Sequence, residues 1–453
     1  MKSSRAVFTA MIAGAALVSL FGCENKPAPE SEPAPIELEV GYWQAFITLP
    51  GGDVEAGIEI SQDGELYQAS LINGQERVRI DSVIFADGEL TLRFPAFNSE
   101  VNATLVDGRL VGDLTLVKRY GETQTMPFNA VPGSESRQET SAAPGTDLSG
   151  RWAVTFHEED ADDDSYIGEF AQRGSRLFGT FLHPNGDYRY LAGHVRGNEF
   201  RMSTFDGSHV FFFSGSVGDD GRISRADFWS GTTWHQQWSG VRNENATLPD
   251  AFSRTFLKPG YDRFEFEFAN EDGVLVSIDD EKYRDKVLIV TIAGTWCPNC
   301  NDEARFLAPF HKKYRDQGLE IVALLFEHFE DAELAAAQAR RFREKFDIEY
   351  DTLIAGISDK TDAAETLPAL SAVLAFPTTI FIDRAGQVRQ IHTGFVGPGT
   401  GEHYINLQDS FTELTTALLD EPAGAAEPNS TDDPPGEDLG EAFPAEAEPA
   451  AQE

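Results

Sequence analysis

Cysteine is scarce in this chain, whose 453 residues include only three: Cys23, Cys297 and Cys300. Cys23 lies near the N-terminus and the other two are three residues apart, so no cysteine is left for a structural disulfide. The fold must therefore depend on hydrophobic cores. With 41% hydrophobic residues and 33 phenylalanines, the chain can build such cores, and its length favours about three domains.

Positive charge is also in short supply. The chain has 36 Lys and Arg against 75 Asp and Glu, a formal net charge of −39. Without a basic stripe to displace counterions, nucleic acid is not an expected partner. Part of the acidity is local, because residues 421–453 contain no Lys or Arg, and we expect a disordered acidic tail there. A solvating role is the simpler interpretation of this tail, and a recruitment arm is the alternative.

Metal-ligand spacing is missing as well. A structural zinc site needs four ligands, and the nine histidines show no close pairing. His311 is the first histidine after the cysteine pair at 297 and 300, and it stands alone. We therefore expect no metal site.

The N-terminus has the pattern of an export signal. Lys2 and Arg5 begin it, and the apolar, small-residue-rich run over 6–21 has the length of a signal segment rather than of a full membrane span. The run leads into Leu-Phe-Gly-Cys, ending at Cys23, which resembles a bacterial lipoprotein box.

The resemblance implies that residues 1–23 comprise a signal peptide and its lipidation site, and that Cys23 is lipidated and becomes the first mature residue. Glu24 follows it in place of the Asp that commonly retains lipoproteins in the inner membrane, which favours the outer membrane, facing the periplasm. Residues 24–37 are Pro-rich and would form an extended tether. An ordinary signal peptide with a chance cysteine is the alternative.

Two segments, 38–131 and 148–245, share a pattern of turn signals and are joined by a linker over 132–147. Short runs of alternating apolar and polar residues lie between the turns, which is typical of antiparallel hairpins. We therefore predict two copies of an all-β unit, each a small sandwich or barrel. The matching turns are Gly41-Tyr42-Trp43 with Gly150-Arg151-Trp152, Asn73-Gly74 with Asn185-Gly186, and Asp107-Gly108 with Asp220-Gly221.

The second copy is unusually aromatic. This richness indicates core packing, and a groove for a ligand or peptide is the alternative. The residues concerned are Phe211, Phe212, Phe213, Phe228, Trp229, Trp234 and Trp238.

From about residue 255, strand and helix patterns alternate. The run 286–293 is almost continuously apolar, as in a buried central strand, and 297–317 has a helical pattern. This alternation predicts an α/β domain over 255–420. The further elements expected are strands at 319–326, 378–383 and 388–392, and helices at 332–346 and 403–419.

Cys297 and Cys300 fall at the turn between this buried strand and the helix that follows. A helix N-terminus stabilises a thiolate through its unpaired N–H groups and its dipole. Residues three apart share one face of a helix, so the two sulfurs can close a disulfide. The pair therefore favours disulfide exchange, with the Cys297–Cys300 disulfide itself as the redox centre and no other cofactor.

Residues 262–420 resemble the thioredoxin fold, and within it the TlpA-like thiol-disulfide oxidoreductases of the bacterial envelope, which include ResA. A Cys-x-x-Cys pair alone is moderately specific, but its combination with a downstream Pro-Thr-Thr strand is strong. The resemblance covers the last third of the chain. It rests on Trp296-Cys297-Pro298-Asn299-Cys300, on Glu303, and on Phe376-Pro377-Thr378-Thr379.

The resemblance implies roles for these residues. Cys297 would be the exposed attacking thiol, and Cys300 the deeper thiol that resolves the mixed disulfide. Pro377 would be a cis-proline that faces the pair and presents backbone to an extended substrate. Glu303 would shuttle a proton or set the local field, although a plain first-turn helix carboxylate is as good an interpretation. The residues expected to line the substrate site are Trp296, Phe376 and Thr378.

One departure from the pattern concerns proton transfer. Thioredoxins carry a buried Asp where this chain has Thr291, so deprotonation of Cys300 would need Glu303 or water. No histidine lies between the cysteines, which favours the reducing direction. The expected partners are periplasmic protein thiols and disulfides and an upstream electron-donor protein.

Two other functions fit the sequence less well. A thiol peroxidase needs Thr three residues before its cysteine, whereas Thr295 lies two before Cys297 and the preceding strand has no proline. A non-enzymatic binding lipoprotein would use the β units alone, and the intact cysteine pair argues against it.

Overall fold

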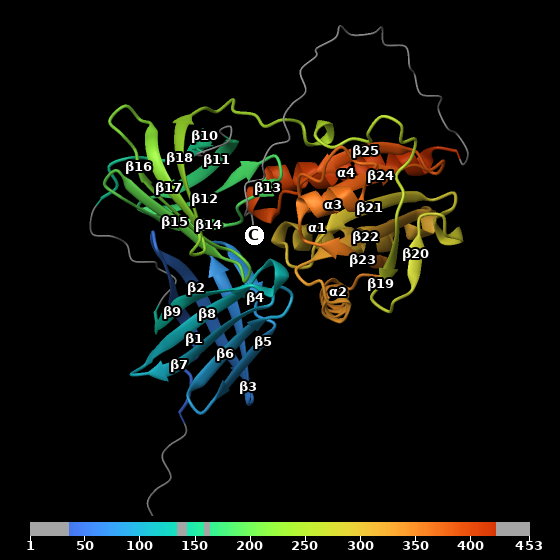
Figure 1. The fold of residues 1–453 in the computed structure, drawn as a ribbon. Helices are drawn as coiled ribbons and strands as arrows, with labels where there is room; N and C mark the ends of the chain where they lie inside the picture. The colour runs from blue at the N-terminus through green and yellow to red at the C-terminus, as the bar shows by residue number, and fades with distance from the viewer. Residues whose placement is uncertain (1–35, 134–142, 158–163, 423–453) are drawn as a thin grey trace, which may run out of the picture. The chain divides into compact units, whose positions relative to one another are not determined.

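The structure is a computed structural model that describes residues 36–133, 143–157 and 164–422 (Figure 1). Cys23, the tether up to residue 35 and the tail from residue 423 lie outside the described residues, so the predictions made for them stay predictions. Within the described part, every helix is too short or too polar to cross a lipid bilayer. From Leu38 onward the chain forms one unit, which contains two β regions and an α/β region.

The first β region is a nine-stranded antiparallel sheet in the order β4-β3-β2-β1-β9-β8-β7-β6-β5. Because the order ends at β4 and β5, this sheet is an open half-barrel. Its turns follow the sequence signals: Asp107 and Gly108 both have positive φ, 49° and 75°, as a two-residue hairpin turn requires. The strands are β1 (Gly41–Leu49), β2 (Gly52–Asp63), β3 (Leu66–Asn73), β4 (Glu76–Arg79), β5 (Ser82–Ala86), β6 (Glu89–Phe94), β7 (Ser99–Val106), β8 (Arg109–Val117) and β9 (Thr123–Pro132).

The second β region has the same up-and-down order of strands, β11-β10-β18-β17-β16-β15-β14-β12-β13, and an additional pairing between β11 and β12. That pairing closes the sheet into a barrel, which leaves it no open edge of the kind the first region has. The all-β character of both copies is therefore confirmed, although only the second is a closed barrel. The strands are β10 (Gly150–His157), β11 (Asp164–Arg173), β12 (Arg176–His183), β13 (Gly186–Asp187), β14 (Leu191–Arg196), β15 (Glu199–Phe205), β16 (Val210–Ser216), β17 (Ile223–Ser230) and β18 (Trp234–Arg242).

Side chains of the barrel pack in the hydrophobic core of the half-barrel. Phe205 and Phe212 belong to the hydrophobic core of the first region although they come from β15 and β16. Ser203 Oγ donates to Glu55 O and accepts from Glu55 N, both at 3.0 Å. Gly51 makes room for this packing, because a Cβ there would lie 2.2 Å from the Trp229 ring. The two β regions are thus packed together.

The aromatic side chains of the barrel serve packing. Phe211, Phe213, Phe228 and Trp238 lie in the barrel's own core, with ring contacts such as Phe213–Phe228 at 4.4 Å. Such ring pairs add to the free energy gained by burial. Core packing therefore accounts for most of the aromatic richness, and Trp229 and Trp234 are partly buried at the edges of the cores.

The α/β region contains a seven-stranded mixed sheet in the order β20-β19-β23-β22-β21-β24-β25. The central strand β21 is buried at every position and pairs in parallel with β22 and antiparallel with β24. The predicted strands and helices are present, whereas β23 and α3 were not predicted individually. The elements are β19 (Glu267–Asn270), β20 (Leu275–Ser277), β21 (Val287–Ala293), α1 (Pro298–Tyr314), β22 (Leu319–Glu327), α2 (Ala332–Phe346), β23 (Asp351–Ile357), α3 (Lys360–Thr366), β24 (Thr378–Ile382), β25 (Val388–Thr393) and α4 (Glu402–Asp420).

Candidate active site

The cysteine pair lies where the buried strand β21 turns into helix α1. Cys297 is the N-cap residue of α1, with extended backbone (φ −87°, ψ 119°), and Pro298 occupies the first helical position. The Sγ atom of Cys297 accepts a hydrogen bond from the backbone N–H of Cys300 at 3.3 Å. A side chain in this position faces the unpaired N–H groups of the first turn, and these stabilise a negative charge on it.

Both cysteines are free thiols, and both are buried. Cys297 is 6% exposed and Cys300 1%. The order of depth agrees with the expectation, but the prediction that Cys297 is exposed is wrong for this arrangement. The reason is that Trp296 and Phe376 flank the thiol and are themselves buried.

The environment of Cys300 opposes ionisation. Burial raises the pKa of this thiol well above its usual value, and the hydrogen bond with Cys297 and the nearby Glu303 charge raise it further. A protonated thiol is a weak nucleophile. Cys300 therefore needs a base before it can attack a mixed disulfide.

The loop before β24 faces the pair through its backbone. The Phe376–Pro377 peptide bond is cis, as the motif predicts. The Sγ of Cys297 donates to the carbonyl oxygen of Phe376 at 3.3 Å. The hydroxyl of Thr378 donates to Ala375 O at 2.9 Å and its side chain is buried, so Thr378 shapes the loop from within and is not a residue that lines an open groove.

The end of β22 holds the turn before the cysteines. Glu327 accepts hydrogen bonds from the Thr295 N–H at 3.0 Å and the Thr295 hydroxyl at 2.7 Å. The Trp296 indole N–H donates to Phe326 O at 2.8 Å, and the ring stacks on His328 at 4.6 Å. Burial raises the pKa of Glu327 to about 7 and lowers that of His328 to about 3. Sequence reasoning missed Glu327 and His328, and the signal that could have found them is a buried apolar strand that ends in a polar pair.

Glu303 lies on α1 with its carboxylate inside the domain. It accepts hydrogen bonds from the hydroxyl of Thr291 at 2.5 Å and from that of Thr379. Burial raises the pKa of Glu303 to about 7, against the opposing effect of these two hydroxyls. Thr291 stands where thioredoxins carry Asp, and its hydroxyl binds the carboxylate of Glu303, which comes from helix α1.

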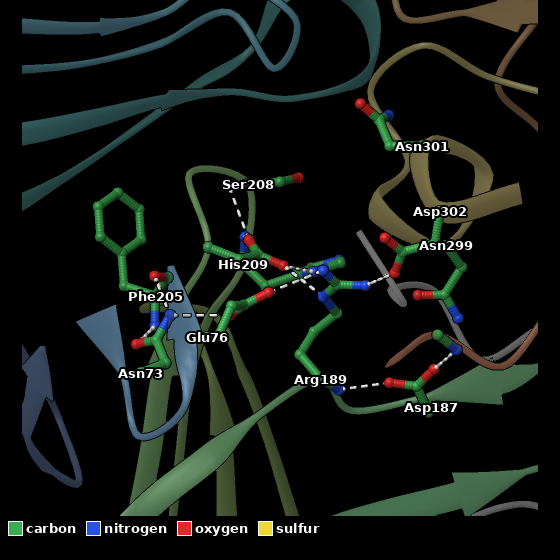
Figure 2. A network of polar contacts seen from close by, with 12 residues as sticks. Asn73, Glu76, Asp187, Arg189, Phe205, Ser208, His209, Asn299, Asn301 and Asp302 are labelled. Atoms are coloured by element: carbon green, nitrogen blue, oxygen red, sulfur yellow. Dashed lines mark hydrogen bonds and ion pairs between the residues drawn. The ribbon is translucent and has the colours of Figure 1, made fainter. Parts of the chain in front are cut away.

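A buried charge network, which we call the Arg189 cluster, connects α1 to both β regions (Figure 2). Arg189 pairs with Glu76 at 3.0 Å, with Asp206 at 3.4 Å and with Asp302, while Asp187 lies close to it. Burial alone would lower the pKa of Arg189, but the four carboxylates hold it well above its ordinary value. Sequence reasoning missed this cluster entirely, since nothing in the pattern distinguishes these charges from those of surface loops.

No group of three or more His, Cys, Asp or Glu side chains in the described ranges is arranged to hold a metal ion. The two thiols and the buried carboxyl of Glu303 are the titratable groups that lie together at the start of α1.

In a comparison with known protein families, residues 247–404 match the Redoxin family model. The thioredoxin-like protein YneN of Bacillus subtilis is 28% identical over 138 residues, which are 30% of this chain and 73% of YneN. The thiol-disulfide oxidoreductase ResA of the same organism is 24% identical over 151 residues, 33% of this chain and 76% of ResA. A solved structure of a putative thiol:disulfide interchange protein DsbE from Chlorobium tepidum aligns with 36% of this chain and 99% of its own length, at 22% identity and a TM-score of 0.28.

The matched residues 247–404 include the Cys-x-x-Cys pair that caps α1 and the cis-proline loop beside it. The C-terminal region of this chain is accordingly a thioredoxin-fold domain of the TlpA/ResA-like thiol-disulfide oxidoreductases.

Proposed function

We propose that this protein is a lipid-anchored enzyme of the cell envelope that reduces disulfides in periplasmic proteins. The anchor would be Cys23, on the strength of the lipoprotein box around it, and Glu24 supports an outer-membrane position facing the periplasm. The β regions would space the redox domain from the membrane or direct it to its partners.

The observation that carries this proposal is the position of the Cys297 sulfur. It accepts the Cys300 N–H at the start of α1 and lies 3.3 Å from the carbonyl oxygen of the residue before the cis-proline. The first contact gives the sulfur a backbone N–H donor at a helix N-terminus. The second places the sulfur next to backbone that an extended substrate segment can pair with as an added strand.

Reduction would proceed in two exchanges. The Cys297 thiolate attacks one sulfur of the substrate disulfide, that S–S bond breaks, and the other substrate sulfur leaves as a thiolate. Cys300 then gives its proton to a base and attacks Cys297 Sγ, which closes the Cys297–Cys300 disulfide and releases the second substrate thiolate. Two electrons pass to the substrate, and its two thiolates take up the protons that the enzyme thiols have lost.

Glu303 is the group best suited to act as that base. Its pKa of about 7 lets it accept a proton near neutral pH, and its charge already influences the Cys300 thiol. The oxidised pair must then be reduced by an upstream protein that carries a dithiol, which supplies two electrons for each cycle.

Replacement of Cys300 by serine is expected to trap the first intermediate. In Cys300→Ser, Cys297 can still attack a substrate disulfide, but no second thiol is present to release it. Mixed disulfides should therefore accumulate through Cys297, and mass spectrometry of the adducts would identify the substrates. Cys297→Ser is the matched control and should accumulate none. If Cys300→Ser forms no adduct with reducible protein disulfides, the assigned roles are wrong.

The direction of the reaction predicts a reducing potential. The Pro298-Asn299 dipeptide between the cysteines contains no histidine to stabilise the reduced form further. We expect a redox titration of the wild-type pair to give a potential nearer about −270 mV than about −120 mV. A value near the oxidising end would favour an oxidase instead.

A further inference from the structure

Turns of the β barrel cover the surface around the cysteine pair. The hydroxyl of Ser208, in the turn between β15 and β16, donates to the carbonyl oxygen of Trp296 at 3.2 Å. Gly186 lies against Asn299, since a Cβ at Gly186 would be 2.1 Å from the Asn299 amide nitrogen. One barrel turn and the short strand β13 therefore touch the segment that carries the reactive thiol.

The barrel also touches the loop that follows β25 and packs beside the cis-proline. The N–H of Gly394 donates to Pro377 O at 2.8 Å. A Cβ at Gly394 would lie 2.6 Å from the Asn185 backbone, so these two segments of the chain are in direct contact. The backbone that follows the cis-proline strand is therefore covered by the barrel.

The half-barrel approaches from the side of Trp296. In its short 3-10 turn Arg119–Gly121, the N–H of Tyr120 donates to His328 O at 2.9 Å. His328 is the residue whose ring stacks on Trp296. Arg119 in the same turn pairs with Asp359. The first β region is thus fastened to the residue that supports the indole.

The Arg189 cluster holds these contacts together (Figure 2). Asp302, on α1 two residues after Cys300, is 1% exposed and pairs with the buried Arg189 of the barrel, which also binds Glu76 of the half-barrel. Asp187 accepts the Gly397 N–H at 2.5 Å. Buried charges are tolerated when they are paired, and each of these would be hydrated again if the β regions moved away. The ion pairs of the Arg189 cluster can therefore hold the β regions against the thioredoxin-like domain, and they can also break together when the β regions move as a rigid body.

We propose that the two β regions are a cover over the redox site, fastened by the Arg189–Asp302 pair, and that a protein disulfide reaches Cys297 only when the cover moves off the thioredoxin-like domain. This inference rests on the proposed function, because it concerns how the substrate of that reaction gains access. With Cys297 6% exposed, a folded partner cannot bring its sulfur into line with the thiol. Opening is therefore a step of the reaction cycle, and the cover selects partners that favour the open arrangement.

The test compares alkylation of Cys297 by two reagents in full-length protein carrying Cys300→Ser. Iodoacetamide is small, and a maleimide on a polyethylene glycol chain is bulky. Asp302→Asn removes the charge on the α1 side of the fastening, while Arg189 keeps Glu76 and Asp206. We expect Asp302→Asn to raise the rate of Cys297 alkylation by the bulky reagent about tenfold or more. The rate of alkylation by iodoacetamide should rise by a smaller factor.

Arg305→Gln is the matched control. Arg305 is an exposed partner of the same Asp302 carboxylate on the same helix, and its contact does not cross to the barrel, so the rates should stay within about twofold of the parent. Ser208→Gly is a second variant that removes one surface hydroxyl and leaves the charge cluster intact, and it should raise the bulky rate in the same direction.

Each rate is taken relative to the rate of the same reagent with the unfolded protein. Equal relative rates with the two reagents in the parent protein would overturn the cover, and so would an unchanged ratio in both folded variants. Because alkylation requires no disulfide exchange, a catalytically inert protein could still show the cover, and an active one could lack it. The two proposals therefore fail separately.

Discussion

Replacing Cys297 by serine is expected to abolish disulfide reduction, with turnover falling about a thousandfold or more. A serine hydroxyl stays protonated at neutral pH, and oxygen cannot form the mixed disulfide through which two-electron exchange proceeds. Cys300 cannot take over the attack, because it is 1% exposed and burial raises its pKa. Insulin reduction followed by turbidity, with a chemical dithiol as electron donor, measures the effect.

The fold should survive this substitution. Cys297 is the N-cap of α1, and serine is among the most favourable N-cap residues, so the melting temperature should change little. Cys300→Ser is the matched control, since it stops turnover yet keeps the first attack. Residual turnover of Cys297→Ser within tenfold of the wild type would mean that another group performs the attack.

Local features of the sequence predicted much of the redox domain. The apolar run up to Ala293, the cysteine spacing and the Phe376-Pro377 motif each depend on neighbours in sequence, and the structure has them as a buried strand, a helix N-cap and a cis bond. Turn residues such as Asp107-Gly108 likewise predicted hairpins, because a positive φ is a local requirement.

Features that depend on long-range contacts were beyond the sequence. Arg189 is separated by 113 residues from both Glu76 and Asp302, and each charge alone has the pattern of a solvated loop. The same limit bears on Cys297: the family resemblance predicts an exposed thiol, whereas Cys297 is buried beside Trp296 and Phe376. The barrel, which lies outside the resemblance, contacts the neighbouring residues Trp296 and Asn299. The core of the half-barrel also contains Phe205 and Phe212 of the second β region. The alternation of apolar and polar residues within 38–131 could not indicate that these two side chains pack there.

The carboxyl of Glu303 should control the second exchange. Glu303→Gln keeps the shape of the side chain and one of its two accepting oxygens but cannot accept the Cys300 proton. We expect the rate constant for resolution of a preformed mixed disulfide to fall about a hundredfold or more at neutral pH. In the wild type this rate constant should rise with pH through about 7, where Glu303 ionises, and the variant should lose that inflection. Rapid-mixing experiments with a chromogenic mixed disulfide would measure both.

Glu327→Gln separates this role from burial alone, because Glu327 is an equally buried carboxyl with a pKa of about 7 whose hydrogen bonds go to Thr295. Resolution in that variant should keep the inflection.

For each carboxyl the native pKa lies above the ordinary value of 4.5, so its contribution to the free energy of unfolding is fully present below pH 4.5 and is lost as pH rises through about 7. The loss is roughly 3 kcal/mol per group. Urea unfolding between pH 4.5 and 7 should therefore show a weaker pH dependence in both variants, whereas only Glu303→Gln should change the kinetics. If the rate of mixed-disulfide resolution keeps the same pH profile in Glu303→Gln, Glu303 is not the base and water takes the proton of Cys300.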